Sequence, residues 1–438
     1  MQTGPENLGR SLISREKAGS TQVRTVALTN QLWSLVIRVA SLAGKAGIML
    51  VLAKEMTVEA YGQFGLIAVT IGFAIYLLGF EFYTHSVRNI VGTAEKDIET
   101  YIRDHFVFIF LGYLLWLPLA YTSAMFGAVP VSLILEFYAL LIIEHLSAEI
   151  YRYLVAIKKP VSASISFFLR NASWAYAMTA LIYGGVLDVG VAAVLHYWIA
   201  GSFASVLFGA YRLDLRWGNF FGKRIDWNWI RKGMYVGSGF LAGTLLLRAT
   251  GIVDRYLIHF YLGDYSVGIY TLYVSIVGIV STFFESGLLM HAFPGILEAH
   301  KDGNVALYRT RLRTFFRQSV WVSIALIAGA FALFHVLIGF EIIKPEYGEE
   351  SGAFLVMLLS VFVKNVSFTP HYGLYVNGVD SKILTSSAAG FVAEVALCVL
   401  LIPVLGLLGA ATAVFSANAL ILLLKTRSYF LHDANKTA

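Results

Sequence analysis

Two segments of the sequence place a cation at each end of a short apolar stretch. The first is RVASLAGK, from Arg38 to Lys45, and the second is RATGIVDR, from Arg248 to Arg255. A spacing of seven residues is about two turns of a helix, so each pair would lie on one helix face. Fixed positive charge attracts phosphate, and the forked arginine head suits phosphate oxygens. The pattern predicts an anion-binding surface on two related helices.

The elements that carry these cations are apolar enough to lie in a membrane. The chain has 438 residues, of which 58% are hydrophobic and 14% are charged. Soluble domains usually carry about 25% charged residues. Apolar runs of about 20 residues, each long enough to cross a bilayer as a helix, recur along the chain. The fold class predicted is an all-α polytopic membrane protein.

About twelve transmembrane helices are expected, in two six-helix lobes. The predicted spans are 30–53, 60–82, 104–126, 129–151, 162–184, 190–211, 233–257, 265–290, 315–339, 352–376, 383–404 and 407–424. The predicted units are an N-terminal tail (1–29), an N-lobe (30–211), a cytoplasmic amphipathic linker (212–232), a C-lobe (233–424) and a C-terminal tail (425–438).

The Lys and Arg residues outside the spans predict the orientation. Nearly all of them lie in the two tails and in every second loop, whereas the opposite loops hold only Lys54 and Lys344. Basic loops stay in the cytoplasm, so both termini are expected there. The net charge of +6 therefore reflects topology, and no nucleic-acid partner is inferred from it.

A cation at mid-membrane costs about 2.5–3.5 kcal/mol on insertion scales, so it needs a compensating role. Snorkelling to the interface accounts well for Arg255 and acceptably for Arg38. It accounts poorly for Lys45 and Arg248, for which a water-filled cavity is favoured over a structural ion pair. Further candidates for this cationic cavity are Arg170 and Lys364.

The spans also hold the acids Glu81, Glu136, Glu144, Glu149, Asp254, Glu285 and Glu394. A structural ion pair is the default for each of them. The candidates for proton or sodium coupling are Glu144 with its neighbour His145, Asp254 and Glu285. The only cysteine, Cys398, excludes a disulfide and a Cys-based zinc site, and neither a metal nor a cofactor is predicted.

The two halves of the sequence look alike. MTVEAYGQFGLIAV follows the first span, and LGDYSVGIYTLYVS follows the seventh. In this alignment Gly62 falls on Gly268, Phe64 on Tyr270 and Leu66 on Leu272. A duplication of six helices would relate the halves by an axis along the membrane normal, with a substrate site between them.

These segments resemble the polysaccharide transporter family of the MOP flippase superfamily. The resemblance lies in KEMTVEAYGQFGLIAV, in VDRYLIHFYLGDYSVGIYTLYVSI and in LLGAATAVFSAN. It implies a flippase that moves an undecaprenyl-diphosphate-linked oligosaccharide from the inner to the outer leaflet of a bacterial inner membrane. It also implies a central cationic cavity, and it suggests a polysaccharide polymerase and glycosyltransferases as partners.

Two alternatives stay open. A multidrug exporter of the same superfamily would have the same span count but would favour an acidic cavity. A polytopic polysaccharide polymerase or ligase would need a sizeable outer loop that carries its chemistry. The outer loops here are short, and they contain no Gly-rich phosphate loop, metal-spacing cluster or nucleophile elbow. The sequence therefore favours a transporter over an enzyme.

Overall fold

The computed structural model describes residues 5–91, 95–125, 127, 129–215 and 224–437. These residues are almost entirely helical, and they contain no strand. A helix satisfies its own backbone hydrogen bonds, which is what a chain without access to water requires. Residues 216–223 of the predicted linker lie outside the described residues.

The N-terminal helix group, α1–α8, precedes residues 216–223. Its helices are α1 (Pro5–Glu55), α2 (Val58–Gly79), α3 (Tyr83–Ile90), α4 (Glu95–Met125), α5 (Ile134–Ala156), α6 (Pro160–Phe168), α7 (Trp174–Tyr183) and α8 (Val191–Leu213). A 3-10 turn (η1, Val131–Leu133) precedes α5, and a π-helix (η2, Leu169–Ser173) joins α6 to α7.

The C-terminal helix group, α10–α15, contains long helices with internal breaks. Its helices are α10 (Trp227–Ala249), α11 (Val253–Phe284), α12 (Met290–Lys301), α13 (Val305–Gly339), α14 (Ser351–Val376) and α15 (Asp380–Thr437). A π-helix (η3, Glu285–Leu289) joins α11 to α12, and a 3-10 turn (η4, Pro345–Gly348) precedes α14. Gly263 and Gly406 adopt left-handed backbone angles that break α11 and α15.

Eight stretches of helix in the described residues are long and apolar enough to cross a membrane. Two of them, 227–301 and 380–432, each contain two of the predicted spans. The spans predicted at 104–126 and 162–184 fall largely on α4 and on α6 to α7. The all-α polytopic class predicted from the sequence is therefore confirmed.

One predicted span is wrong in its extent. The helix expected over 233–257 ends at Ala249, and a new helix begins at Val253. The turn between them is closed by tight bonds from the amides of Gly251 and Ile252 to carbonyls three residues earlier. Asp254 lies in the first turn of α11, where a carboxylate favours a helix start. Arg248 and Arg255 therefore do not share a helix face.

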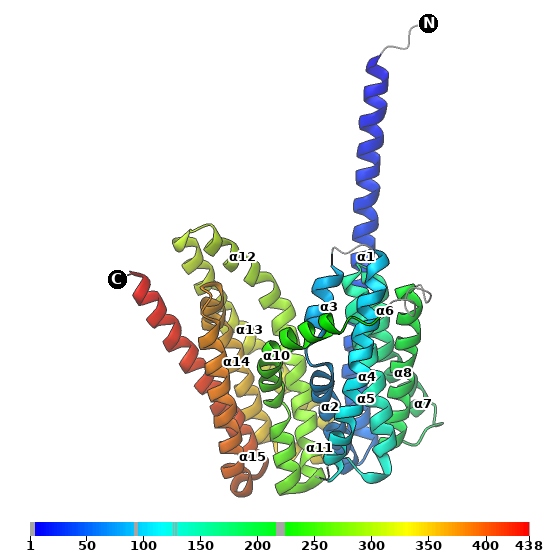
Figure 1. The fold of residues 1–438 in the computed structure, drawn as a ribbon. Coiled ribbons are helices and arrows are strands. Elements are labelled where there is room, and N and C mark those ends of the chain that lie inside the picture. Colours follow the sequence, from blue (N-terminus) through cyan, green and yellow to red (C-terminus); the bar gives the residue numbers. More distant parts are fainter. Residues whose placement is uncertain (1–4, 92–94, 126, 128, 216–223, 438) are drawn as a thin grey trace.

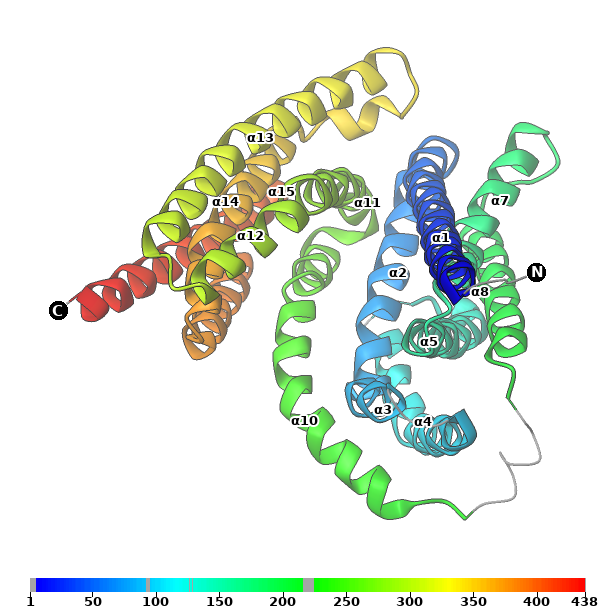
Figure 2. The same cartoon turned by 90° about the horizontal axis from the view of Figure 1, so that it is seen from above.

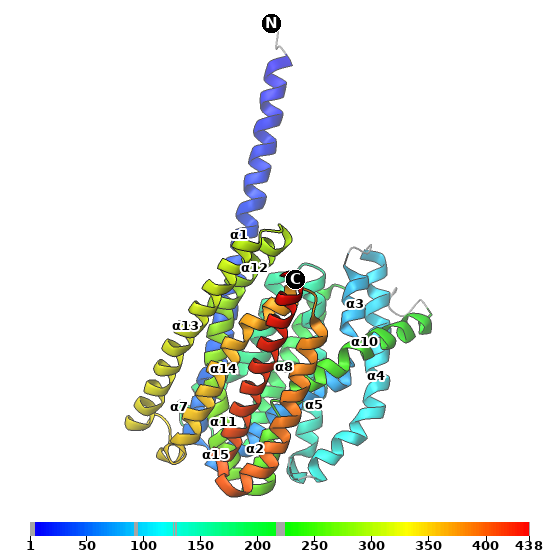
Figure 3. The ribbon, with the colours of Figure 1, turned by 90° about the vertical axis from the view of Figure 1, so that its left-hand side faces the viewer.

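The helices form two groups that diverge. Seen from above, α1–α8 lie together on one side and α11–α15 on the other, with α10 curving between them (Figure 2). Both chain ends lie at the same end of the bundle, and the groups spread apart toward that end (Figure 1). The side view shows α13, α14 and α15 next to one another in the C-terminal group (Figure 3).

The two groups meet where α2 packs against α11. A Cβ atom added to Gly62 would lie 2.1 Å from the carbonyl oxygen of Asp264, and one added to Gly268 would lie 2.0 Å from that of Val58. Val58 and Asp264 are as far apart in sequence as the two glycines are. The contact is thus reciprocal, as expected for duplicated halves around an axis.

Polar bonds surround this contact. The Gln63 side chain donates to Asp264 Oδ2 over 2.9 Å, and Lys344 Nζ donates to the carbonyl of Met56 over 2.6 Å. Lys344 is one of the two cations in the predicted outer loops. Its hydrogen bond to Met56 joins the two helix groups at the end away from the chain termini.

Candidate functional site

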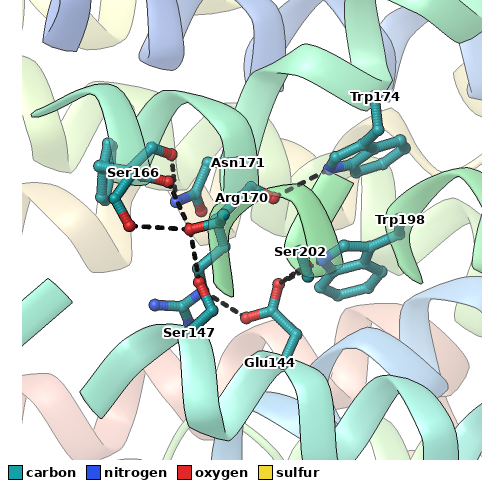
Figure 4. A network of polar contacts seen from close by, with 10 residues as sticks. Glu144, Ser147, Ser166, Arg170, Asn171, Trp174, Trp198 and Ser202 are labelled. Atoms are coloured by element: carbon teal, nitrogen blue, oxygen red, sulfur yellow. Dashed lines mark hydrogen bonds and ion pairs between the residues drawn. The ribbon is translucent and has the colours of Figure 1, made fainter. Parts of the chain in front are cut away.

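The carboxylate of Glu144, buried on α5, is the centre of a polar cluster (Figure 4). Arg170 Nε donates to Glu144 Oε2 over 2.5 Å. Trp198 Nε1 and Ser202 Oγ donate to Oε1 over 2.5 and 2.8 Å. Three donors, one of them charged, compensate this carboxylate, as a buried acid requires.

The π-helix η2 positions Arg170 in that cluster. Its wider turn interrupts the regular helix, as π-segments often do at functional sites. Trp174 Nε1 donates to the Arg170 carbonyl over 3.2 Å, which ties the segment to the next turn. Ser147 and Ser166 each lie 2.8 Å from the hydroxyl of Ser205. Such small polar residues let membrane helices approach and bond across their interface.

Arg38 and Lys45 both face α5. Arg38 Nη2 lies 3.4 Å from the Tyr151 hydroxyl. Lys45 lies close enough to Glu144 for the carboxylate to act on its ammonium group. The α1 residues are seven apart and so are their α5 partners, in opposite chain directions. Since α1 is continuous through both cations, they share one helix face, as the sequence predicted.

Arg248 lies on Tyr76 of the N-terminal helix group. Its Nη2 donates to the Tyr76 hydroxyl over 2.6 Å, and its guanidinium carbon lies 4.3 Å from the ring centroid. Arg152 approaches the same ring at 6.0 Å and lies 3.8 Å over the ring of Tyr83. It also forms an ion pair with Glu149.

Sequence reasoning missed Arg152 as a site residue, because it assigned residues from 152 onward to a cytoplasmic loop. The α5 helix continues to Ala156. A signal was present, because Glu149 and Arg152 stand three residues apart and such residues are neighbours on a helix.

The remaining predicted residues lie elsewhere. Asp254 is buried and accepts bonds from the Tyr270 hydroxyl (2.6 Å) and the amide of Arg255 (2.8 Å). Lys364 Nζ lies 3.7 Å from Glu285 Oε1, with both side chains partly exposed. Glu285 belongs to η3, so each π-helix contributes one member of an ion pair.

The predicted residues thus form separate clusters. Arg170 pairs with Glu144, with Lys45 of α1 in its vicinity, Lys364 pairs with Glu285, and Arg248 lies on Tyr76. His145 points away from Glu144, with its Nδ1 3.0 Å from the Tyr113 hydroxyl. In the described part of the chain, no group of His, Cys, Asp and Glu residues has the arrangement of a metal site.

This fold is shared with solved membrane transporters of low sequence identity. It is similar to an inward-facing multidrug resistance MATE family transporter of the MOP superfamily, with a TM-score of 0.71 and 14% identity over 91% of this chain and 95% of that chain. It is also similar to lipid II flippase MurJ in an inward closed conformation, with a TM-score of 0.67 and 14% identity over 90% and 87% of the two chains.

The family model described as "Polysaccharide biosynthesis protein" matches residues 27–300. The chain therefore belongs to that family, as the sequence motifs indicated. An outward-facing MATE transporter superposes less well, with a TM-score of 0.53 and 14% identity over 93% of this chain and 94% of that chain. No curated protein matches the chain by sequence.

Proposed function

We propose that the chain is a flippase that moves an undecaprenyl-diphosphate-linked oligosaccharide from the inner to the outer leaflet by alternating access. The observation that carries the proposal is the meeting of Arg152 and Arg248 on Tyr76. These cations come from opposite helix groups, so one diphosphate bound by both would bridge the two groups. Among the described residues, no carboxylate forms an ion pair with Arg248.

The remaining cations fit a path for the same substrate. Lys45, Arg170 and Arg38 lie on the N-terminal helix group, while Lys364 and Arg255 lie on the C-terminal one. We propose that both termini lie in the cytoplasm and that the protein resides in the bacterial inner membrane. Glycosyltransferases would then act before it, and a polymerase after it, on the same lipid-linked glycan. We propose no catalytic step for the chain.

A multidrug exporter is the less favoured candidate. It would present uncompensated carboxylates to a cationic drug. Here Glu144 is held by Arg170, and Glu285 lies beside Lys364. Proton or sodium coupling through Glu144, His145, Asp254 or Glu285 would serve either function, so it does not discriminate between them.

Depletion of the protein in its native cell tests the proposal. A membrane-impermeant sugar label then reports which leaflet carries the accumulated lipid-linked glycan. Accumulation that is hidden from the outside supports the flippase. Unpolymerised glycan that accumulates on the outer face overturns it and favours the polymerase, whereas no accumulation on either face favours drug export.

A further inference from the structure

Glu149 and His145 stand one turn apart on α5 and are fully buried. The Arg152 guanidinium binds Glu149 Oε1. The Nε2 atom of His145 lies 3.6 Å from that same oxygen, just beyond hydrogen-bond range. Two groups therefore face one carboxylate oxygen, and one of them gains its positive charge only when it binds a proton.

Three polar atoms at this place are buried without a hydrogen-bond partner within the described chain. They are His145 Nε2, Glu149 Oε2 and, on the neighbouring helix α4, His105 Nε2. A buried polar atom left unpaired costs about 1–3 kcal/mol, so three together require an explanation. Two of the three atoms belong to histidines and the third to the carboxylate that faces His145, so each belongs to a side chain that can bind or release a proton.

We propose that Glu149 and His145 form a proton-binding site that controls the availability of Arg152 to an anionic substrate. The controlling role rests on the proposed function. A proton taken from water binds His145 Nε2, and the imidazolium then donates to Glu149 in place of Arg152. The released guanidinium turns to the substrate phosphate beside Arg248. Return of the proton to water restores the Arg152–Glu149 pair.

Several other groups surround the site and set its charge balance. They are Tyr153 on α5, Tyr113 on α4, Tyr76 on α2, Glu81 between α2 and α3, and Tyr83 and His85 on α3. Glu81 is the one acid of this set, and it acts on Arg152 from the side of Tyr83. Four of these six groups are tyrosines, which carry no charge near neutral pH.

The first experiment measures proton binding without any substrate. Purified protein in lipid nanodiscs is titrated between about pH 5 and pH 8, the range of histidine, while carboxylate and imidazole infrared bands are recorded. We expect a pH-dependent change that Glu149→Gln and His145→Asn abolish. Glu136→Gln is the matched control, because it removes from the same helix an acid that also faces a histidine, with its Oε1 3.5 Å from His196 Nε2, and it should keep the change. A change that survives Glu149→Gln and His145→Asn overturns the proton site.

The second experiment measures the binding of inorganic pyrophosphate to the same nanodiscs. Wild-type affinity should rise on acidification, by up to about tenfold per pH unit within the titration range. Glu149→Gln should bind tightly at every pH, because Arg152 is then always free, and Arg152→Gln should bind weakly at every pH. If pyrophosphate binding by the wild type does not depend on pH although the infrared change is present, the proposed control of Arg152 is overturned. Neither experiment uses a lipid-linked glycan, so a failure of the proton site and a failure of the proposed flippase function can be told apart.

Misfolding is separated from these effects by the thermal unfolding midpoint of each variant. Arg152→Lys provides a second check, because it keeps the charge but lacks the fork. It should retain the pH dependence of pyrophosphate binding with a lower affinity. Loss of that dependence in a folded Arg152→Lys protein contradicts control through charge.

Discussion

Arg152 and Arg248 reach the ring of one tyrosine, Tyr76, from opposite helix groups. Arg152 is neutralised by Glu149, whereas Arg248 is held by the Tyr76 hydroxyl. The face of an aromatic ring attracts a cation without neutralising it, so the cation can still bind an anion. An anion that enters here meets two guanidinium groups whose separation changes when the helix groups move. Under the proposed function, an anion held by both residues would connect substrate binding to the separation of the two helix groups.

Replacement of Arg248 should weaken the binding of diphosphate-bearing lipid. A hydrogen bond to a charged group contributes about 1.5–3 kcal/mol, so Arg248→Ala should lower affinity at least tenfold, and Arg248→Lys should lower it less. Binding is measured with the purified protein in nanodiscs. The matched control is Arg88→Ala, since Arg88 lies 5.6 Å from the centroid of Phe240 in a similar contact. An equal loss in both variants would contradict a specific role for Arg248.

Alanine at Gly62 or Gly268 should open the contact between α2 and α11. The added Cβ atom would meet a backbone carbonyl at 2.1 or 2.0 Å, which only a shift of the helices can relieve. Overpacking of this kind costs about 1–3 kcal/mol, enough to shift a two-state population severalfold. Spin-label distances across the contact report the shift.

Gly72 and Gly278 are the matched controls for this experiment. They are related by the same sequence offset as Gly62 and Gly268, and a Cβ atom on either would meet nothing within 4 Å. Gly72→Ala and Gly278→Ala should leave the distances unchanged. Distances that stay unchanged in Gly62→Ala and Gly268→Ala as well would show that the contact does not hold the groups together.

Arg170 and Glu144 should behave as one unit in stability measurements. Removal of one partner leaves a buried charge, at a cost of about 3–5 kcal/mol. Arg170→Gln should therefore destabilise more than the double variant Arg170→Gln/Glu144→Gln. The thermal midpoint of the detergent-solubilised protein gives the comparison. Additive losses would mean that the two side chains are not coupled.

Both chain ends should be accessible from the same side of the membrane. Cys398 is buried, so a Cys398→Ser background allows single cysteines to be placed at Ala438 and in the predicted outer loop at Glu346. An impermeant thiol reagent added to intact cells should label Glu346→Cys and spare Ala438→Cys. The reverse result would invert the predicted orientation.

The helices themselves could be predicted from the sequence, because an apolar run of membrane length has few other solutions. Their ends could not. The break at 250–252 depends on local bonds and on a helix start at Asp254, neither of which interrupts hydropathy. The same limit hid Arg152, because the predicted span stopped at residue 151, just before this charge, whereas α5 continues to Ala156.

The cations were predicted correctly as members of helices. Their partners were not predicted, and the side chains of Arg38, Lys45 and Arg248 are exposed rather than buried within the protein. Whether Lys45 comes near Glu144 depends on how α1 packs against α6 and η2, which sequence spacing alone leaves open. Glu144 and His145 looked like one site because they are adjacent. Neighbours on a helix differ by about 100° in direction, so they point to different helices. The structure places Arg170 on one side and Tyr113 on the other.

The reciprocal contact of Gly62 and Gly268 is made by backbone atoms of both chain halves. The side-chain atom nearest its centre, Val58 Cγ1, is apolar, so neither salt nor pH acts on the contact directly. Because the same geometry occurs twice about one axis, separation of either glycine from its carbonyl separates the other as well. We therefore expect the two halves of the contact to open together, and salt or pH to act on it only through the surrounding bonds of Gln63 and Lys344.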